Sequence, residues 1–152
     1  MAKIQNKISI KNKKAYFDYE IMDKYVCGIK LLGTEIKSVR ESKASIKEAY
    51  CFINNSEVFI KNMHIAEYTN GGFTNHEPYR ERKLLLNKRE ILKIEKKLKD
   101  NGITLVPLLL FLNDNGLAKL EIGIAKGKKL FDKRESLKQK DVKKDIDRLL
   151  KK

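Results

Sequence analysis

Two apolar stretches joined by a short polar turn constrain the fold of this 152-residue chain more than any other feature of its sequence. Residues 104–112 are apolar at nearly every position, and residues 117–125 alternate apolar and polar side chains. This alternation is the pattern of a strand with one buried face. The residues between the two stretches, 113–116 (Asn-Asp-Asn-Gly), are typical of a turn. The sequence therefore predicts a central strand followed by a half-buried one, with a bulge or an edge at Pro107, because proline lacks a ladder donor.

Further short strands and two helices are predicted around this pair. Strands are expected where aromatic and β-branched residues gather between polar turns, at residues 16–21 and 25–31 (two segments or one bent strand), 50–53 and 58–61. One short helix is expected over residues 35–40 with Thr34 as its cap, and a longer one after Asn87, which forms a capping-box pattern with Glu90. Because strand pairs follow one another as hairpins, the prediction is a mainly β fold: a small closed OB-like β-barrel with two or three packed helices.

Residues that carry chemistry are scarce. The sequence has no glycine-rich nucleotide loop, no zinc-protease histidine pair and no nucleophile elbow, so it predicts neither an enzyme nor a cofactor or metal site. Cys27 and Cys51 are expected to be small buried residues in a reducing cytosol. His64 is expected to be structural, whereas His76 falls in a predicted exposed and mobile loop, where it is either solvated or faces RNA.

Positive charge is concentrated in three zones. The chain has 34 Lys and Arg against 20 Asp and Glu, a formal charge of +14. Residues 1–14 hold five lysines and no acid, residues 80–99 hold nine basic and three acidic residues, and residues 126–152 hold twelve basic and five acidic residues. Such an excess indicates an anionic partner, either nucleic acid or an anionic membrane surface. A membrane is disfavoured because no apolar run is long enough to span it and acids interrupt the basic face of the tail.

Two basic clusters favour nucleic acid. Arg80, Arg82 and Lys83 lie within four residues and are predicted to clamp a phosphate backbone; a second cluster includes Lys37 and Arg40. Either cluster alone is equally typical of a solvated charged surface. Together with aromatic residues on a small barrel they make RNA binding the leading prediction.

The sequence divides into three predicted parts: a basic N-terminal arm (1–14), the barrel (15–130) and a basic tail (131–152). Val142, Ile146, Leu149 and Leu150 share one face of the tail at helical spacing. This apolar surface is too small to fold alone, so the tail is expected to be disordered until it binds a partner and becomes helical.

Four motifs in order resemble the SsrA-binding protein (small protein B) family. They span residues 12–19, 33–40 (Gly-Thr-Glu-Ile-Lys-Ser-Val-Arg), 80–86 (Arg-Glu-Arg-Lys-Leu-Leu-Leu) and 123–134, which contains Gly-Ile-Ala-Lys-Gly-Lys-Lys and Asp-Lys-Arg. The resemblance implies an OB-type barrel that binds the tRNA-like domain of transfer-messenger RNA. It further implies delivery of this RNA to stalled bacterial ribosomes in the cytoplasm, the process called trans-translation. Alanyl-tRNA synthetase and the elongation factor that carries aminoacyl-tRNA are implied as indirect partners.

The resemblance also implies roles for individual residues. The positions that match those of the RNA-binding surface, or belong to its motifs, are Asn12, Lys13, Lys14, Glu35, Lys37, Ser38, Arg40, Arg80, Arg82, Lys83, Leu85 and Lys119. Of these, Asn12, Lys37, Arg40 and Lys119 are expected to contact RNA directly, and Glu35 and Leu85 to organise the surface. The ribosome-contacting stretch of the tail, implied to enter the empty mRNA channel and decoding centre, matches Lys126, Lys128, Lys129, Phe131, Asp132, Lys133 and Arg134.

Three positions depart from the family pattern. Val26 replaces a frequent acid, Phe131 a common histidine, and Val142 a common tryptophan. Phe131 can stack on a base but cannot titrate. Two alternatives stay open: a general RNA chaperone and a ribosome-associated structural protein. Both would bind many folded RNAs equally well. The protein is expected to be a monomer.

Overall fold

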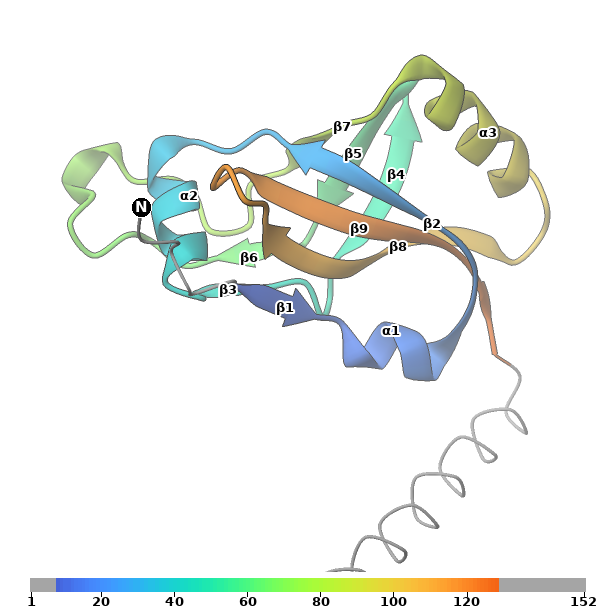
Figure 1. Cartoon of the computed structure of the whole chain (residues 1–152), viewed down its shortest axis with the longest axis horizontal. Helices are drawn as coiled ribbons and strands as arrows, with labels where there is room; N and C mark the ends of the chain where they lie inside the picture. The colour runs from blue at the N-terminus through green and yellow to red at the C-terminus, as the bar shows by residue number, and fades with distance from the viewer. Residues whose placement is uncertain (1–7, 129–152) are drawn as a thin grey trace, which may run out of the picture.

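Six antiparallel strands close into a ring in the computed structural model, which describes residues 8–128 (Figure 1). The order around the ring is β8–β4–β5–β7–β2–β9, and β9 pairs back with β8. These strands are β2 (Tyr19–Ile29), β4 (Tyr50–Asn54), β5 (Glu57–Lys61), β7 (Arg82–Leu85), β8 (Ile103–Leu112) and β9 (Ala118–Gly127). The closure confirms the predicted mainly β fold.

Smaller elements attach to this ring. They are β1 (Ser9–Lys11), which pairs with β8, the two-stranded sheet of β3 (Ala44–Ser45) and β6 (His64–Ile65), the helices α1 (Lys13–Asp18), α2 (Gly33–Arg40) and α3 (Lys88–Leu98), and a 3-10 turn, η1 (Gly72–Thr74). Helices α2 and α3 lie at opposite ends of the ring (Figure 1). Residues 9–14, expected to belong to a basic arm, thus contribute β1 and the start of α1.

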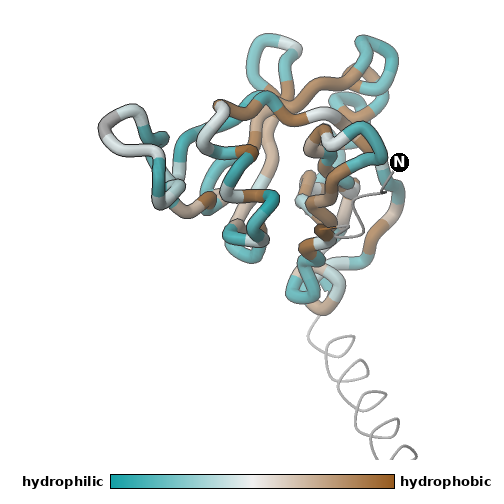
Figure 2. Tube along the Cα trace, turned by 60° about the vertical axis from the view of Figure 1, so that its left-hand side comes forward, coloured by the Kyte–Doolittle hydropathy of each residue, from teal (hydrophilic) through white to brown (hydrophobic). Residues whose placement is uncertain are grey.

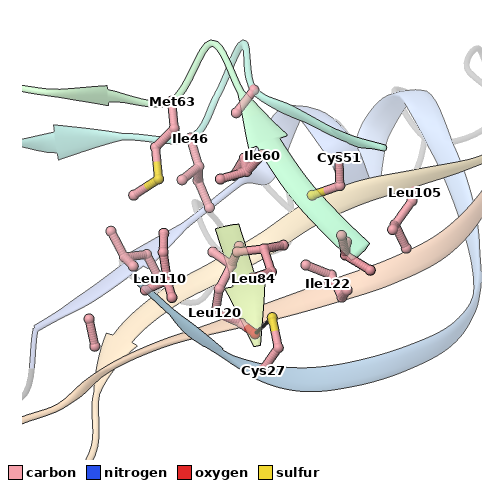
Figure 3. Packing of buried hydrophobic residues seen from close by; sticks show 14 of the residues in the cluster. Cys27, Ile46, Cys51, Ile60, Met63, Leu84, Leu105, Leu110, Leu120 and Ile122 are labelled. Atoms are coloured by element: carbon pink, nitrogen blue, oxygen red, sulfur yellow. Dashed lines mark hydrogen bonds between the residues drawn. The ribbon is translucent and has the colours of Figure 1, made fainter. Parts of the chain in front are cut away.

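The core fills the inside of the ring. Alternate residues of each strand point inward, among them Ile60, Leu84, Leu110, Leu120 and Ile122, all 0–1% exposed (Figure 3). Hydrophobic segments accordingly follow the strands, and several peripheral turns are hydrophilic (Figure 2).

Both cysteines are buried in this core, as predicted. Cys27 Sγ donates to the carbonyl oxygen of Leu120 at 3.3 Å. Burial raises the pKa of the Cys27 thiol to about 12 and also raises the pKa of Cys51.

The central hairpin of β8 and β9 has the predicted turn and bulge. The pairing register shifts between Pro107 and Leu109, as expected where a proline cannot donate. In the turn, the side-chain oxygen of Asn113 accepts hydrogen bonds from the amides of Asn115 and Leu117 at 3.0 and 2.9 Å. Capping also determines α3, where Asn87 and Glu90 form the predicted reciprocal pair.

Helix α1 replaces the first half of the strand predicted at residues 16–21. Asn12 caps this helix by accepting a hydrogen bond from the Ala15 amide at 3.1 Å, and β2 then begins at Tyr19. From there β2 is one continuous strand with a register shift between Ile21 and Asp23, so the second alternative, a bent strand, is correct beyond Tyr19.

The segment between β6 and β7 also differs from the prediction. His76 is only 4% exposed, so it neither is solvated nor faces RNA. Its Nε2 lies 2.8 Å from the carbonyl oxygen of Ile65, and its Nδ1 lies 2.9 Å from the hydroxyl of Thr34. A carbonyl only accepts, so Nε2 carries the proton. Thr34 therefore anchors this segment, and the N-cap position of α2 is Leu32 rather than Thr34.

Within residues 8–128, no helix is both long and apolar enough to cross a membrane. The same residues contain no group of three or more histidine, cysteine, aspartate or glutamate side chains arranged to hold a metal ion.

Candidate nucleic-acid interface

A buried ion-pair network underlies helix α2. The Glu35 carboxylate, 0% exposed, accepts hydrogen bonds from Arg82 Nε and, at 2.6 Å, from Arg80 Nη2. Arg82 is itself 0% exposed and donates further to the carbonyl oxygens of Met63 (2.6 Å) and Pro78 (3.2 Å). All of these partners are internal, so Arg82 joins α2 to β7 and does not clamp a phosphate, contrary to the prediction.

The network also holds the charge of Glu35. Burial alone would raise the pKa of this carboxyl group, but hydrogen bonds from Arg80, the Leu32 amide and Arg82 outweigh burial and hold the pKa below its ordinary value. Arg80 keeps about a third of its side chain exposed, yet its Nη2 is committed to Glu35. The predicted clamp is thus reduced to Lys83, whose ammonium lies 3.3 Å from Glu57.

Helix α2 presents two of the predicted cations to solvent. Lys37 and Arg40 are exposed, and the Lys37 ammonium lies 5.3 Å from the centre of the Tyr68 ring. Ser38, which lies between them, is 0% exposed and therefore supports the helix from inside. The guanidinium of Arg40 reaches the β8–β9 turn, where its Nη2 lies 4.0 Å from the position that a Cβ of Gly116 would take. The network around Glu35 thus fixes the position of two exposed cations.

A cross-strand row brings together two further predicted residues that are distant in the sequence. Gly28 of β2 is paired with Leu85 of β7 on one side and with Lys119 of β9 on the other. Leu85 is 51% exposed and covers the glycine, with its Cβ and Cδ1 3.4 Å from the position of a Gly28 Cβ. Val26 lies two residues before Gly28 on the same face and is 53% exposed. We call Val26, Gly28, Leu85 and Lys119 the β7–β2–β9 surface.

Asn12 lies outside the β7–β2–β9 surface and has a structural role. It is 4% exposed, and its amide nitrogen donates to the carbonyl oxygens of Pro107 (2.9 Å) and Ile46 (3.2 Å). The expected direct contact with RNA is therefore corrected: Asn12 ties α1 to the bulge of β8. The neighbouring Lys13 and Lys14 are exposed, and Lys14 pairs with Glu48 at 3.2 Å.

The start of the tail is the last predicted region. Lys126 is exposed near the end of β9 and pairs in register with Glu20, and Lys128 follows the strand. The other predicted tail residues lie outside the described residues: Lys129, Phe131, Asp132, Lys133 and Arg134, together with Val142.

Two features of the exposed surface have no counterpart in the predicted site. Gly28 lies at the centre of the β7–β2–β9 surface, where Leu85 covers it, and only the strand register identifies this position. Lys11 and Lys24 lie 5.0 and 5.3 Å from the centre of the Tyr16 ring, so a cation–aromatic cluster adjoins Lys13 and Lys14. Lys24 is also half exposed and lies 3.7 Å from Glu121.

Comparison with known proteins identifies the family. The family model described as SmpB protein matches residues 9–152. The chain belongs to the SmpB family. Among its relatives, the SsrA-binding protein of Christiangramia forsetii is 54% identical over 148 residues, covering 97% of this chain and 94% of the relative. The SsrA-binding protein of Phocaeicola vulgatus is 56% identical over 144 residues, covering 95% and 96%.

A solved SmpB-family structure has the same fold. It is described as "tmRNA-SmpB: a journey to the center of the bacterial ribosome". Its chain is 38% identical to this one, with a TM-score of 0.70 over 86% of this chain and 94% of that one. This likeness confirms the predicted fold class.

Proposed function

We propose that this protein is a non-enzymatic RNA-binding adaptor that binds the tRNA-like domain of transfer-messenger RNA and delivers it to stalled ribosomes for trans-translation. The observation that carries the proposal is the β7–β2–β9 surface, where an exposed Leu85 and the cation of Lys119 flank a glycine. The SsrA-binding proteins that cover nearly the whole chain supply the choice of RNA.

The surface suits a folded RNA for physical reasons. A lysine neutralises phosphate, and an exposed apolar side chain packs against ribose or an unstacked base. Because Gly28 has no side chain, Leu85 packs over it, and the exposed apolar contact lies beside the cation of Lys119. Lys37 and Arg40 of α2 and Lys13 and Lys14 of α1 add further phosphate contacts.

The tail is proposed to act on the ribosome rather than on transfer-messenger RNA. Its basic residues from Lys126 to Arg134 would lie along ribosomal RNA in the empty mRNA channel and decoding centre. Release of counterions favours such binding. Alanyl-tRNA synthetase and the elongation factor would meet the protein only through the RNA that it carries, in the cytoplasm.

The two parts are separable by truncation. Deleting residues 131–152 is expected to leave the affinity for transfer-messenger RNA within about twofold, because the β7–β2–β9 surface is intact, and to abolish peptide tagging on stalled ribosomes. Both properties are measured on the same preparation, by electrophoretic mobility shift and by a reconstituted tagging assay. Equal loss of both would refute the division.

A competition experiment tests the proposal itself. Labelled transfer-messenger RNA bound to the full chain is challenged with unlabelled transfer-messenger RNA or with bulk tRNA at matched salt. The proposal predicts that bulk tRNA competes at least about tenfold less well, which corresponds to about 1.4 kcal/mol. Equal competition would instead support a general RNA chaperone or a ribosome-associated structural protein.

A further inference from the structure

The outward face of the β4–β5 hairpin carries aromatic rings. Its inward side chains, such as Val58 and Ile60, are 0% exposed and fill the core. A strand that is buried on one face normally carries polar side chains on the other. Here Asn54, Glu57 and Lys61 share the outward side with three aromatic residues, Tyr50, Phe52 and Phe59, which we call the aromatic face.

The rings form a continuous π surface. Phe52 and Phe59 are cross-strand partners, with ring centres 5.7 Å apart and planes at 26°. Tyr50 continues the row, with its ring centre 6.3 Å from that of Phe52, and it is 42% exposed. Phe52 and Phe59 are partly exposed. Phe52 and Phe59 are thus near-parallel, whereas the ring of Tyr50 is tilted by 43° against that of Phe52. Exposed aromatic side chains on a sheet are a surface on which unpaired bases stack.

Lysines border the aromatic face at the positions where phosphates of a stacked strand would lie. Lys61 is the cross-strand partner of Tyr50, and Lys83 of β7 is the partner of Phe59. The nearby acid on β5, Glu57, is already engaged by Lys83 at 3.3 Å. This charge arrangement is complementary to a polyanion with exposed bases.

A hollow of about 410 Å³ adjoins the aromatic face at Phe52. It lies between β4, α3 and β8, and polar side chains of Glu95, Lys99 and Thr104 contribute to its lining. This hollow is open to solvent, so it extends the outer surface beside Phe52 rather than enclosing a ligand.

The aromatic face is continuous with the β7–β2–β9 surface. Lys83 and Leu85 are two residues apart on β7 and point to the same, outer side of the ring, because the intervening Leu84 is buried. One outward row runs from Leu85 through Gly28 to Lys119, and the next runs from Lys83 through Phe59 to Phe52.

We infer that the aromatic face binds a single-stranded RNA segment, with bases stacked on Phe52, Phe59 and Tyr50 and phosphates near Lys61 and Lys83. The inference goes beyond the proposed function in assigning a second site, and it rests on that function only for the choice of RNA as the occupant. The aromatic face binds unpaired bases, whereas the β7–β2–β9 surface is proposed to bind a folded RNA.

The test uses the full chain and a fluorescein-labelled single-stranded oligoadenylate, with binding followed by anisotropy. The double variant Tyr50→Leu/Phe59→Leu keeps the face apolar but removes two rings, and it is expected to bind the oligonucleotide about tenfold or more weakly. The loss is expected to persist at high salt, since stacking releases no counterions, whereas Lys61→Gln is expected to reduce the salt slope by about one.

Tyr79→Leu is the matched control, because Tyr79 is 56% exposed and its ring lies away from the aromatic face, beside His64. It should bind the oligonucleotide like the unsubstituted protein. Should the double variant not fold, Tyr50→Leu alone replaces it. Unchanged oligonucleotide binding by the folded variant would overturn the inference. Affinity for the tRNA-like domain, measured in parallel, tests the proposed function separately.

Discussion

Glu35 and Arg82 show how much one buried charge pair determines around this site. Neither side chain is exposed. The two form an ion pair, and Arg82 also donates hydrogen bonds to two backbone carbonyl oxygens. Residue type and spacing in the sequence do not distinguish an arginine buried in an internal ion pair from one that binds phosphate. The difference arises from burial, which only the fold determines, and it explains why the clamp predicted for residues 80–83 is only partly present.

Replacing Glu35 by glutamine is expected to destabilise the protein by about 3–5 kcal/mol, because it leaves the charge of Arg82 buried without its partner. Chemical denaturation measures the free energy of unfolding. Lys37→Gln, an exposed change on the same helix, serves as the control and is expected to stay within about 0.5 kcal/mol. A folded Glu35→Gln variant of unchanged stability would contradict this account of the network.

The same carboxylate predicts a pH dependence. The folded pKa of Glu35 lies below its ordinary value of 4.5, so its stabilising contribution is complete above that pH and is lost as the pH falls through the folded value. Unfolding measured between pH 7 and pH 3 should therefore show a decline in stability on the acid side. That decline should be shallower in Glu35→Gln; an identical slope would show that another group is responsible.

The buried thiols allow a simpler check at the residue scale. With the pKa of Cys27 raised to about 12 and that of Cys51 also raised, neither forms a thiolate at pH 8 in the folded state. A disulfide reagent should label both thiols within minutes in denaturant and neither on that timescale in native buffer. Rapid labelling of the native protein would contradict the packing of the core.

At the scale of elements, the capping signals correctly mark one helix start, that of α3, whereas Thr34 does not cap α2 and the cap of α1 at Asn12 was not predicted. The Asn87–Glu90 pair correctly marked the start of α3. The equivalent signal for α1 is Asn12, but the next six residues are too few to show a helical period, and their aromatic residues favour a strand. A tertiary contact favours the helix over the strand here: the side-chain amide of Asn12 also donates to the carbonyl oxygen of Pro107, 95 residues away.

Close packing between strand β9 and the core gives a prediction for this element. A Cβ at Gly123 would lie 2.7 Å from Leu108 Cδ1 and 3.2 Å from Ile21 Cγ2, so Gly123→Ala is expected to cost about 1–3 kcal/mol of stability. Gly127→Ala on the same strand is the control, because its Cβ would meet nothing within 4 Å. Thermal unfolding of both variants checks the difference; equal melting temperatures would contradict the packing.

For the whole molecule, the closed, mainly β fold was predictable, whereas the order of its strands and the proposed RNA surface were not. Hairpin patterns in the sequence predict the β4–β5 and β8–β9 pairs, but the ring is closed by pairings between strands far apart in the sequence, β2–β7, β2–β9 and β4–β8. The β7–β2–β9 surface, however, depends on the register that pairs Gly28 with both Leu85 and Lys119. A shift of one residue in either pairing would turn these side chains into the core.

Internal ion pairs reduce the positive charge that the whole molecule presents at its surface. The chain carries +14 overall, but buried pairing removes Arg82 from the surface and commits Arg80 largely to Glu35. The predicted cations that remain at the surface include Lys119, which is partly exposed, and the exposed lysines and arginine of α1 and α2. Affinity for RNA should therefore depend on salt through this small set of residues rather than through total charge.

The central claim is that the β7–β2–β9 surface binds the tRNA-like domain, and its most direct test is the dissociation constant of the full chain for that domain measured across a salt series. Lys119→Gln is expected to weaken binding about tenfold and to reduce the salt slope by about one, while Leu85→Ala weakens binding with the slope unchanged. Lys97→Gln, an exposed change on α3, should do neither. Binding by the Lys119 and Leu85 variants that equals that of the unsubstituted protein would contradict the account.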